Sequence, residues 1–236
     1  VGGTTGCGIG SAAVASGQQT LTLSTITAGD GAYVCTITFT DSAGNEASAL
    51  TLTSFTLDTT ANTPSETTAV STPTNDETPD VVITTDEAGT IVVAGTTGCG
   101  IGSAAVSSGQ QTLTLSEITQ GDGAYVCTIT FTDSLGNAAS ALTLTSFTLD
   151  NAVATPTETT AVTTPTKDTS PDVVITTTQA GTIAVGGTTG CGVDSAAVSS
   201  GQQTITLSTI TAGDGAYVCT ITFTDSAGNA AGALTL

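Results

Sequence analysis

The sequence predicts an all-β protein made of tandem β-sandwich domains, and three observations lead to this prediction. The cysteines repeat with a period of 92 residues, at Cys7, Cys99 and Cys191 and again at Cys35, Cys127 and Cys219. Short apolar runs alternate with threonine and are separated by Gly, Pro, Asp and Asn, which is typical of strands joined by turns. No segment shows a competing helical period. A fixed period indicates an array built from one module.

The copies are nearly identical, which bears on function before any site is considered. Thr4–Asp58 and Thr96–Asp150 differ at five positions only. A specialised active site is needed once, whereas a spacer or a lattice subunit is useful many times, so the repetition favours an architectural role. We expect a partial domain at 1–60 without its first strands, a complete domain at 61–152, and a nearly complete one at 153–236 without the end of its last strand. We call these the first, second and third unit.

The complete unit contains six strand-like runs in order. They cover 67–72, 80–86, 89–95, 111–118, 123–133 and 140–150. In the fifth run Tyr125, Cys127, Ile129 and Phe131 share one face and threonines dominate the other, as a half-buried antiparallel sheet requires. In the last run the leucines at 142 and 144 are out of phase with Phe147, which predicts a bulge or twist near 145–146.

Six or seven such strands in about 90 residues are typical of a β-sandwich. The alternation with threonine also predicts which side chains form its core. These are Tyr125, Ile129, Phe131, Leu113, Leu115, Ile83 and Leu142, with Tyr33 and Tyr217 as the equivalents of Tyr125.

The charge balance excludes two classes of partner. The chain has 20 acidic residues against one basic residue, Lys167, and a net charge of −19. A nucleic-acid binder needs Lys or Arg to displace counterions from phosphates, and an anionic lipid surface would repel this chain. The acidity indicates either solubility through self-repulsion or binding of a divalent cation, because calcium prefers carboxylate oxygens.

The cysteines predict structural disulfides. Each complete copy carries two, none is left over, and the chain has no His and no CxxC motif with which to build a zinc site. Disulfides persist in oxidising compartments, so we expect a cell-surface or extracellular location. No run approaches the roughly 18 apolar residues of a membrane span. Since Val1 aligns with Val93, we expect the chain to be a segment of a longer array.

Catalysis lacks its usual residues, so we expect no enzyme. There is no His and no Arg, and Lys167 corresponds to Asn75 in the preceding copy. Glycosidase carboxylates need a cleft lined with aromatic side chains, and aromatics form 3% of the chain. O-glycans on the Thr- and Pro-rich linker at 155–169 remain an open alternative.

Three motifs carry a resemblance to a known family. DGAYVC at 122–127 places a Tyr two residues before a Cys, like the tyrosine corner of immunoglobulin-like domains. The turn TDSLGN at 132–137 and the junction FTLDTTANTP at 55–64 are similar to those of bacterial immunoglobulin-like repeats. The chain resembles this family, found in large surface proteins and adhesins, over its whole length. The resemblance implies tandem immunoglobulin-like β-sandwich domains in a linear array.

Immunoglobulin-like topology places the loops at two poles and suggests the disulfide pairing. The turn at 73–79, the region of Cys99, the turn at 120–122 and the exit at Asp150 fall at one pole, and the turns at 86–89 and 133–137 at the other. Cys99 then lies near the start of the strand that carries Cys127. We therefore expect the pairs Cys7–Cys35, Cys99–Cys127 and Cys191–Cys219.

Carboxylates recur where one unit meets the next, and related arrays stiffen such junctions with calcium. The resemblance therefore implies two calcium sites. The expected ligands are Asp58, Glu66, Asp86 and Asp133 at the first junction and Asp150, Glu158 and Asp225 at the second. Thr178 and Gln179 replace Asp86 and Glu87 in the later copy, so weaker binding is expected there. Without an ion, turns simply favour Asp for its local hydrogen bonds.

The sequence as a whole predicts a stalk or extender of a bacterial or archaeal surface protein or adhesin. Its partners would be neighbouring repeats of the same chain. The alternative is a self-assembling subunit of an extracellular filament, sheath or surface layer, in which identical chains contact each other laterally. A glycan- or protein-binding module is less well supported, because the copies offer no aromatic platform.

Overall fold

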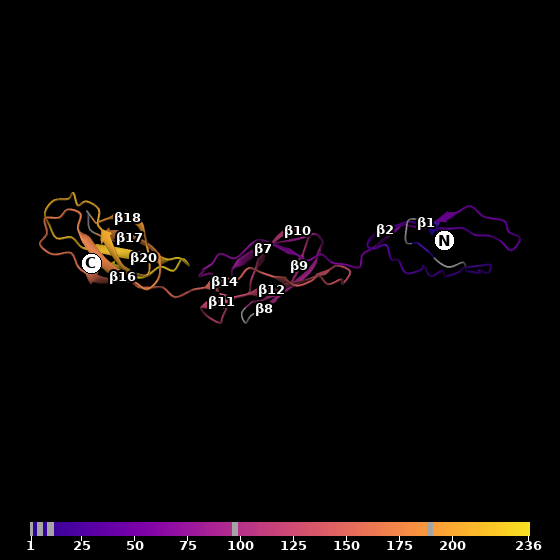
Figure 1. The fold of residues 1–236 in the computed structure, drawn as a ribbon, viewed down its shortest axis with the longest axis horizontal. Helices are drawn as coiled ribbons and strands as arrows, with labels where there is room; N and C mark the ends of the chain where they lie inside the picture. The colour runs from indigo at the N-terminus through magenta and orange to yellow at the C-terminus, as the bar shows by residue number, and fades with distance from the viewer. Residues whose placement is uncertain (1, 4–6, 9–11, 96–98, 188–190) are drawn as a thin grey trace.

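The computed structural model describes residues 1–236 except 1, 4–6, 9–11, 96–98 and 188–190. Within that part of the chain every regular element is a β-strand, and all strand pairing within the sheets is antiparallel. No described helix is long and apolar enough to cross a membrane. Figure 1 shows three bodies in a row, with the two chain ends at opposite ends of the row.

The second unit is a sandwich of two main sheets. One sheet has the order β10-β7-β6, from Gly109–Thr114, Asp80–Thr85 and Ser65–Thr68. The other has the order β13-β12-β8-β9, from Leu142–Thr143, Cys127–Asp133, Gly89–Gly95 and Ile101–Val106. A third pairing joins β11 (Gly123–Tyr125) to β14 (Phe147–Leu149). This is the tandem immunoglobulin-like sandwich that the sequence predicts.

The last strand of the second unit breaks where its apolar phase changes. β13 pairs with β12, the chain leaves the sheet at residues 144–146, and β14 then pairs with β11. The Glu66 carboxylate Oε2 accepts hydrogen bonds from the backbone N–H and the hydroxyl of Thr145, both 2.8 Å long. Glu66 thus satisfies the N–H that the broken ladder leaves unpaired. The predicted irregularity at 145–146 is confirmed.

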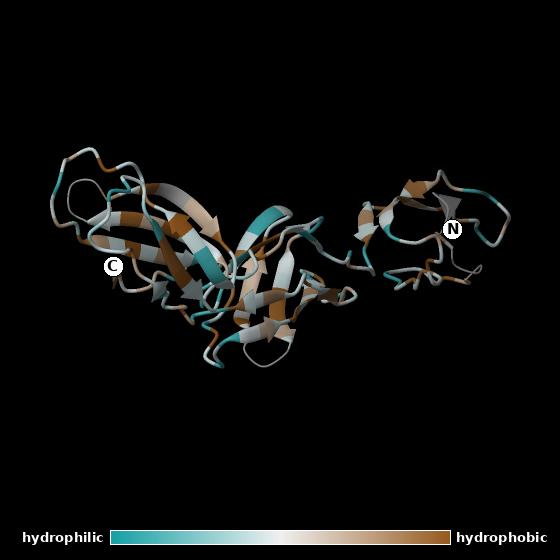
Figure 2. Ribbon diagram, turned by 60° about the vertical axis from the view of Figure 1, so that its left-hand side comes forward, coloured by the Kyte–Doolittle hydropathy of each residue, from teal (hydrophilic) through white to brown (hydrophobic). Residues whose placement is uncertain are grey.

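The core of the second unit follows the predicted alternation. Ile83, Ile129 and Phe131 are each 0–1% exposed, and Leu113, Leu115 and Tyr125 are also buried. Leu142 is an exception: it pairs with the buried Ile129 but lies on the edge strand β13, so it is only half-buried and packs on the edge of the core. Figure 2 shows the alternation as brown and pale segments along the strands.

Each described tyrosine corner closes in the same way. The hydroxyl of Tyr125 donates to the carbonyl of Gly121 at 2.6 Å, and Tyr33 and Tyr217 make the equivalent bonds to Gly29 and Gly213. The Tyr125 ring stacks on Phe147 with centroids 5.7 Å apart.

The third unit repeats these sheets. One has the order β15-β16-β19, from Thr157–Thr160, Asp172–Thr177 and Gly201–Thr206. The other has the order β18-β17-β20-β21, from Val193–Val198, Gly181–Gly187, Cys219–Asp225 and Leu234–Thr235. Tyr217 was predicted to be a core residue like Tyr125, but it is half-buried, because no described residue of this unit stacks on its ring as Phe147 stacks on Tyr125.

The first unit contains β1 (Gly2–Gly3), β2 (Gly31–Tyr33), β3 (Cys35–Ile37), β4 (Leu50–Thr51) and β5 (Phe55–Leu57). They form a sheet β1-β3-β4 and a pair β2-β5. Phe39 is 49% exposed, although its equivalent Phe131 is 1% exposed. In the second unit, strands before residue 93 cover that ring position. The domain boundaries at 60/61 and 152/153 stay a prediction.

Three disulfides link Cys7 to Cys35, Cys99 to Cys127 and Cys191 to Cys219, which are the expected pairs. Cys99 follows β8 and Cys127 opens β12, so the bond joins a loop to the strand beside it within one sheet. Closing a loop of this length stabilises a domain by about 3–4 kcal/mol in the chain-entropy model. Gly95 lies against this point: a Cβ there would come within 2.4 Å of the Val126 carbonyl oxygen.

The sequence analysis missed one strand. None of the six predicted runs covers the segment after Cys99, yet Ile101–Val106 forms β9 and pairs with β8. Its Gly, Ser and Ala residues carry no apolar alternation, so the sequence gives little sign of a strand. An edge position beside the long strand β8 supplies the pairing instead.

We predict that Phe131→Ala lowers the stability of the second unit by about 3–5 kcal/mol, because a large buried ring leaves a cavity. Phe39→Ala changes the equivalent exposed position and should cost less than about 1 kcal/mol. Calorimetric unfolding of both variants measures the difference. Equal losses would contradict the burial assigned to the two rings.

Candidate functional site at the unit junctions

A short hairpin that recurs in every unit builds the junction pole. In the second unit the Asp133 carboxylate accepts hydrogen bonds from the backbone N–H groups of Leu135 and Asn137, at 2.8 and 2.9 Å, and from the Asn137 side-chain amide at 2.7 Å. Gly136 has a φ of 96°, a left-handed conformation that favours glycine. Asp, Gly and Asn at these spacings therefore fix the shape of the hairpin.

The same asparagine also contacts the preceding unit. Asn137 Nδ2 donates to the backbone carbonyl of Asp58 at 3.2 Å, and Asn229 Nδ2 donates to the carbonyl of Asp150 at 2.6 Å. In both cases the acceptor is the residue directly after a closing strand. At each junction one asparagine amide thus bonds both to its own hairpin and to the end of the preceding unit. The two junctions therefore share the same hydrogen-bond arrangement.

The hairpin carboxylates at the two junctions are buried. Asp133 is 6% exposed and Asp225 is 7% exposed, whereas Asp41 at the equivalent place in the first unit is exposed. Burial opposes ionisation of Asp133, but the hydrogen bonds from Asn137 and from the backbone N–H groups of the hairpin outweigh it and lower the pKa of this carboxyl. Asp133 is therefore a buried anion at the seam.

Two more carboxylates meet Asp133 at the first junction. Asp58, Glu87 and Asp133 each offer an oxygen within 4.8 Å of the others. Gly89 faces Asp133 across the ladder, and a side chain there would clash with the Phe131 ring. Three close negative charges repel one another unless they are solvated or bridged by a cation. The group has the oxygen donors that a hard divalent ion prefers.

The second junction replaces one carboxylate by an amide. Gln179 stands at the position of Glu87, and its Nε2 donates to Asp150 Oδ2 at 2.9 Å. The other Asp150 oxygen, Oδ1, accepts from the backbone N–H of Ala152 at 3.1 Å. Asp225 keeps the hairpin bonds from Ala227 and Asn229. The Gln179 amide therefore stabilises the Asp150 carboxylate at this junction, as a bound cation would stabilise the carboxylates at the first.

The expected calcium ligands are only partly brought together. Asp58 and Asp133 meet at the first junction, but their third partner is Glu87, which the predicted ligand set left out. Asp86 is exposed and is not part of the cluster, and Glu66 binds Thr145 within its own unit. Asp150 and Asp225 lie at the second junction through the bonds given above. Glu158 lines a groove of the third unit instead.

Sequence reasoning also missed the carboxylates that hold the linkers. Asp30 accepts from the N–H and hydroxyl of Thr59 at 2.8 and 2.7 Å and from the hydroxyl of Thr60 at 2.6 Å. The hydroxyls of Thr60 and Thr59 lower the pKa of Asp30. Asp122 repeats the contact by accepting from the N–H of Asn151 at 2.7 Å. The repeated G-D-G turn was the available signal for these residues.

A second missed signal lies in the pattern of replacement between copies. Position 87 changes from Glu to Gln, which preserves shape and hydrogen bonding, whereas position 86 changes from Asp to Thr. Preserved shape indicates that the side chain at 87 and 179 has a contact to keep. The thrice-repeated Gly-Asn of the hairpin likewise marks the asparagine that bridges the units.

No protein-family model and no curated protein matches this chain. Among solved structures the chain is similar to a tetra-tandem repeat in the extending region of a large adhesion protein, at 22% identity and a TM-score of 0.30. That alignment covers 91% of this chain and 58% of the other, so this chain spans less than two thirds of its length.

Two further solved structures are similar at lower identity. The fibronectin(III)-like modules of Clostridium thermocellum CbhA match at 12% identity and a TM-score of 0.41, covering 73% of this chain and 90% of theirs. The FN1–FN3 domains of chicken CNTN1 match at 8% identity and a TM-score of 0.41, covering 87% and 75%. No functional inference follows from likenesses this weak.

We predict that the Thr59 amide proton reports ionisation of Asp30. Because the folded pKa is lowered, the hydrogen bonds to Asp30 are fully present above the ordinary Asp value of about 3.9 and are lost as pH falls through the lower folded value. NMR titration of the Thr59 N–H shift should therefore give a midpoint below about 3.9. Asp86→Asn should leave that midpoint unchanged, Asp30→Asn should abolish the titration, and a midpoint above 3.9 would contradict the contact.

Proposed function

We propose that this chain is an extender, a row of sandwich domains that holds other parts of a surface protein or adhesin away from a bacterial or archaeal cell. One observation carries the proposal: the closing strand of one unit ends on the hairpin asparagine of the next, at both junctions. Because the same contact recurs at each junction, each added unit lengthens the row by the same distance. The longest strands have seven residues and span about 23 Å, and the turns at both ends extend each domain to about 30–40 Å.

Two properties of the chain support work outside the cell. A disulfide within each unit suits an oxidising compartment and adds stability where no chaperone acts. The net charge of −19 keeps neighbouring chains apart and the array soluble. Both favour isolated stalks over lateral bundles.

The alternative is a self-assembling subunit of an extracellular filament, sheath or surface layer. Phe39 and Phe55 are 49 and 38% exposed in the first unit, but their equivalents Phe131 and Phe147 are 1 and 3% exposed in the complete second unit, so this exposure does not separate the two functions. A filament subunit would use lateral contacts to join identical chains, whereas an extender needs contacts only along its own chain.

We also propose that the first junction binds calcium. Asp58, Glu87 and Asp133 would be the protein ligands, with water completing the six to eight oxygens that calcium takes. The three close carboxylate oxygens and the buried charge of Asp133 support a cation at this position. Calcium would neutralise the cluster and stiffen the junction. At the second junction the Gln179 amide donates a hydrogen bond to Asp150, which lowers the need for an ion there.

The extender function predicts a constant increment of length. Duplicating residues 59–150 in frame inserts one full period, since Asp150 then leads into Thr59 as Asp58 does. Small-angle scattering should show the maximum dimension rising by about 30–40 Å, with a monomeric mass at all concentrations. Compaction, or a mass that grows with concentration through lateral association, would favour the filament alternative.

The calcium proposal predicts opposite effects of two exchanges. Glu87→Gln should remove the calcium response of the first junction, because a glutamine there can donate to Asp58 as Gln179 donates to Asp150. Gln179→Glu should create a response at the second. Ion concentrations hundredfold above Kd stabilise a native-only binder by about 2.7 kcal/mol, which calorimetry with and without chelator detects.

The exposed Asp86 provides the control for that experiment. Asp86→Asn should keep the wild-type response, since the side chain stands outside the carboxylate cluster. A wild-type protein that shows neither binding heat nor a melting shift with calcium would overturn the proposal and leave the acidity as solvation alone.

A further inference from the structure

The second unit contacts its neighbours at Asp58 and Asp150, and Figure 1 shows these junctions at opposite ends of the middle body. Tension along the row therefore enters this unit after Asp58 and leaves it at Asp150. Paired strands respond to tension in two ways. Strands pulled apart at one end open one pair at a time, whereas strands pulled in opposite directions along their length must break all their contacts together.

Two ladders of the second unit are oriented to open one pair at a time. Ser65 at the start of β6 pairs with Thr84 near the end of β7, so tension before β6 and after β7 acts at one end of the pair. Gly89 at the start of β8 likewise pairs with Asp133 at the end of β12. Neither ladder resists tension with all its bonds at once.

The closing strand β14 is oriented differently. Thr74 and Leu149 form a parallel bridge, in which the Thr74 N–H donates to the Thr148 carbonyl and the Asp150 N–H donates to the Thr74 carbonyl, both at 2.9 Å. Because the two segments run in the same direction, tension pulls the segment of Thr74 toward the first unit and β14 toward the third. The bonds between them are therefore loaded together.

Two side chains extend this contact along the closing strand. Thr72 Oγ1 accepts from the N–H of Thr148 at 3.0 Å. Glu66 accepts from the N–H and the hydroxyl of Thr145, both at 2.8 Å. These bonds join the same two segments as the parallel bridge, so they are loaded with it. We call the contacts between residues 66–74 and 145–150 the clamp.

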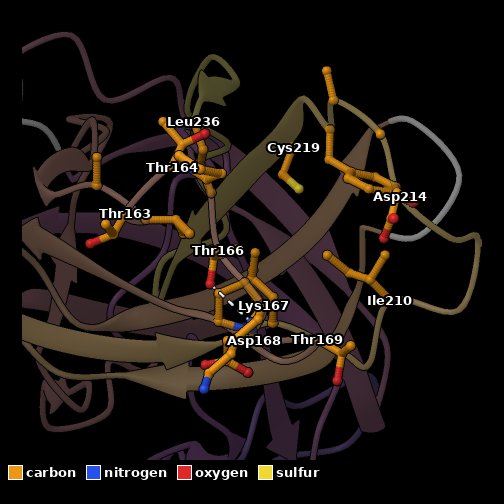
Figure 3. Close-up of a pocket in the computed structure, with 18 of the residues that line it drawn as sticks. Thr163, Thr164, Thr166, Lys167, Asp168, Thr169, Ile210, Asp214, Cys219 and Leu236 are labelled. Carbon is orange, nitrogen blue, oxygen red and sulfur yellow. Dashed lines mark hydrogen bonds between the residues drawn. The ribbon is translucent and has the colours of Figure 1, made fainter.

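Local hydrogen bonds hold the turn that carries Thr74. The Thr74 hydroxyl accepts from the N–H of Asp76 at 3.1 Å, and the equivalent Thr166 hydroxyl accepts from the N–H of Asp168 at 3.0 Å in the third unit (Figure 3). The side chain thus fixes the turn, which leaves the backbone N–H and carbonyl of Thr74 to bond with β14.

The disulfide changes the path of tension once the clamp is broken. Cys99 follows β8 and Cys127 opens β12, 28 residues later, so tension that reaches Cys99 passes through the covalent bond to Cys127. β9, β10 and β11 all belong to the segment between the two cysteines. That segment therefore lies outside the loaded path and stays closed while the rest of the unit extends.

We propose that the second unit is a one-step extensible element, in which the clamp sets the force at which it yields and the disulfide limits the length it releases. The proposal rests on the extender function for its use, since a row under tension benefits from a limited stretch. Of the 92 residues in a period, the 28 from Cys99 to Cys127 stay closed and about 64 extend. At about 3.3–3.6 Å per residue, less about 30–40 Å of folded domain, the unit releases about 170–200 Å.

Single-molecule pulling on the full oxidised chain, held by its two ends, tests the limit set by the disulfide. The second unit should unfold in one step that adds about 170–200 Å of contour length. A thiol reductant added to the extended chain should then release about 90–100 Å more for each unfolded unit, because all three disulfides span 28 residues.

A double variant identifies the step of the second unit. Cys99→Ser with Cys127→Ser changes this unit alone and should lengthen its step to about 260–300 Å. A step of that length in the oxidised wild-type chain, or no further release with reductant, would overturn the disulfide as the limit. The reductant measurement needs no variant, so it decides the question even if the double variant does not fold.

A matched pair of variants tests the clamp. Thr72→Val removes the hydroxyl that accepts the Thr148 N–H and should shorten the lifetime of the second unit at constant force about fivefold, with the step length unchanged. Thr112→Val makes the same change at an exposed position of β10, outside the loaded path, and should leave the lifetime as it is. Equal lifetimes for the two variants would overturn the clamp. A row that lengthens in scattering as an extender should, yet shows neither effect under force, would overturn this proposal alone.

Discussion

The closing strand of each unit has to meet two demands within a few residues, and the rest of the array depends on it. Phe147 and Leu149 are 3 and 0% exposed and complete the core beside the tyrosine corner. Asp150, the next residue, already bonds to Gln179 and Asn229 of the following unit. Asp150 follows Leu149 directly, so no residue separates the core contact from the junction contact. Core packing in one unit therefore positions the next, and Glu66 makes this possible by satisfying Thr145 where the strand changes sheets.

The two junctions solve one electrostatic problem in different ways. Each buries a hairpin aspartate against the end of the preceding unit, which requires compensation for the charge. At the first junction the neighbours are the carboxylates of Asp58 and Glu87, which add to the charge. At the second, the Gln179 amide donates a hydrogen bond and removes one negative charge. A single amide-for-carboxylate replacement thus changes the charge of the junction, within otherwise matching hairpins.

The alternation of apolar residues made the fold predictable, whereas the residues that form the site depend on contacts between positions far apart in the sequence. Alternation of Ile129 and Phe131 with threonine predicted strand, face and core, because the pleat puts every second residue inward. The small residues of β9 carry no such signal. At the junction, sequence could name acidic turns but could not choose Glu87 over Asp86, since adjacent turn residues point in different directions. Nor could it show that Glu66, close to the junction in sequence, serves a strand break, because that role depends on contact with Thr145, 79 residues away.

Core packing and junction contacts together fix one unit relative to the next. Residual dipolar couplings of backbone amides in β12 and β20 test it most directly, because these strands occupy equivalent places in the second and third units. We expect one alignment tensor to fit both strands, with the second junction staying rigid in the presence of chelator. Two independent tensors in the intact protein would contradict the claim and show that the units reorient freely.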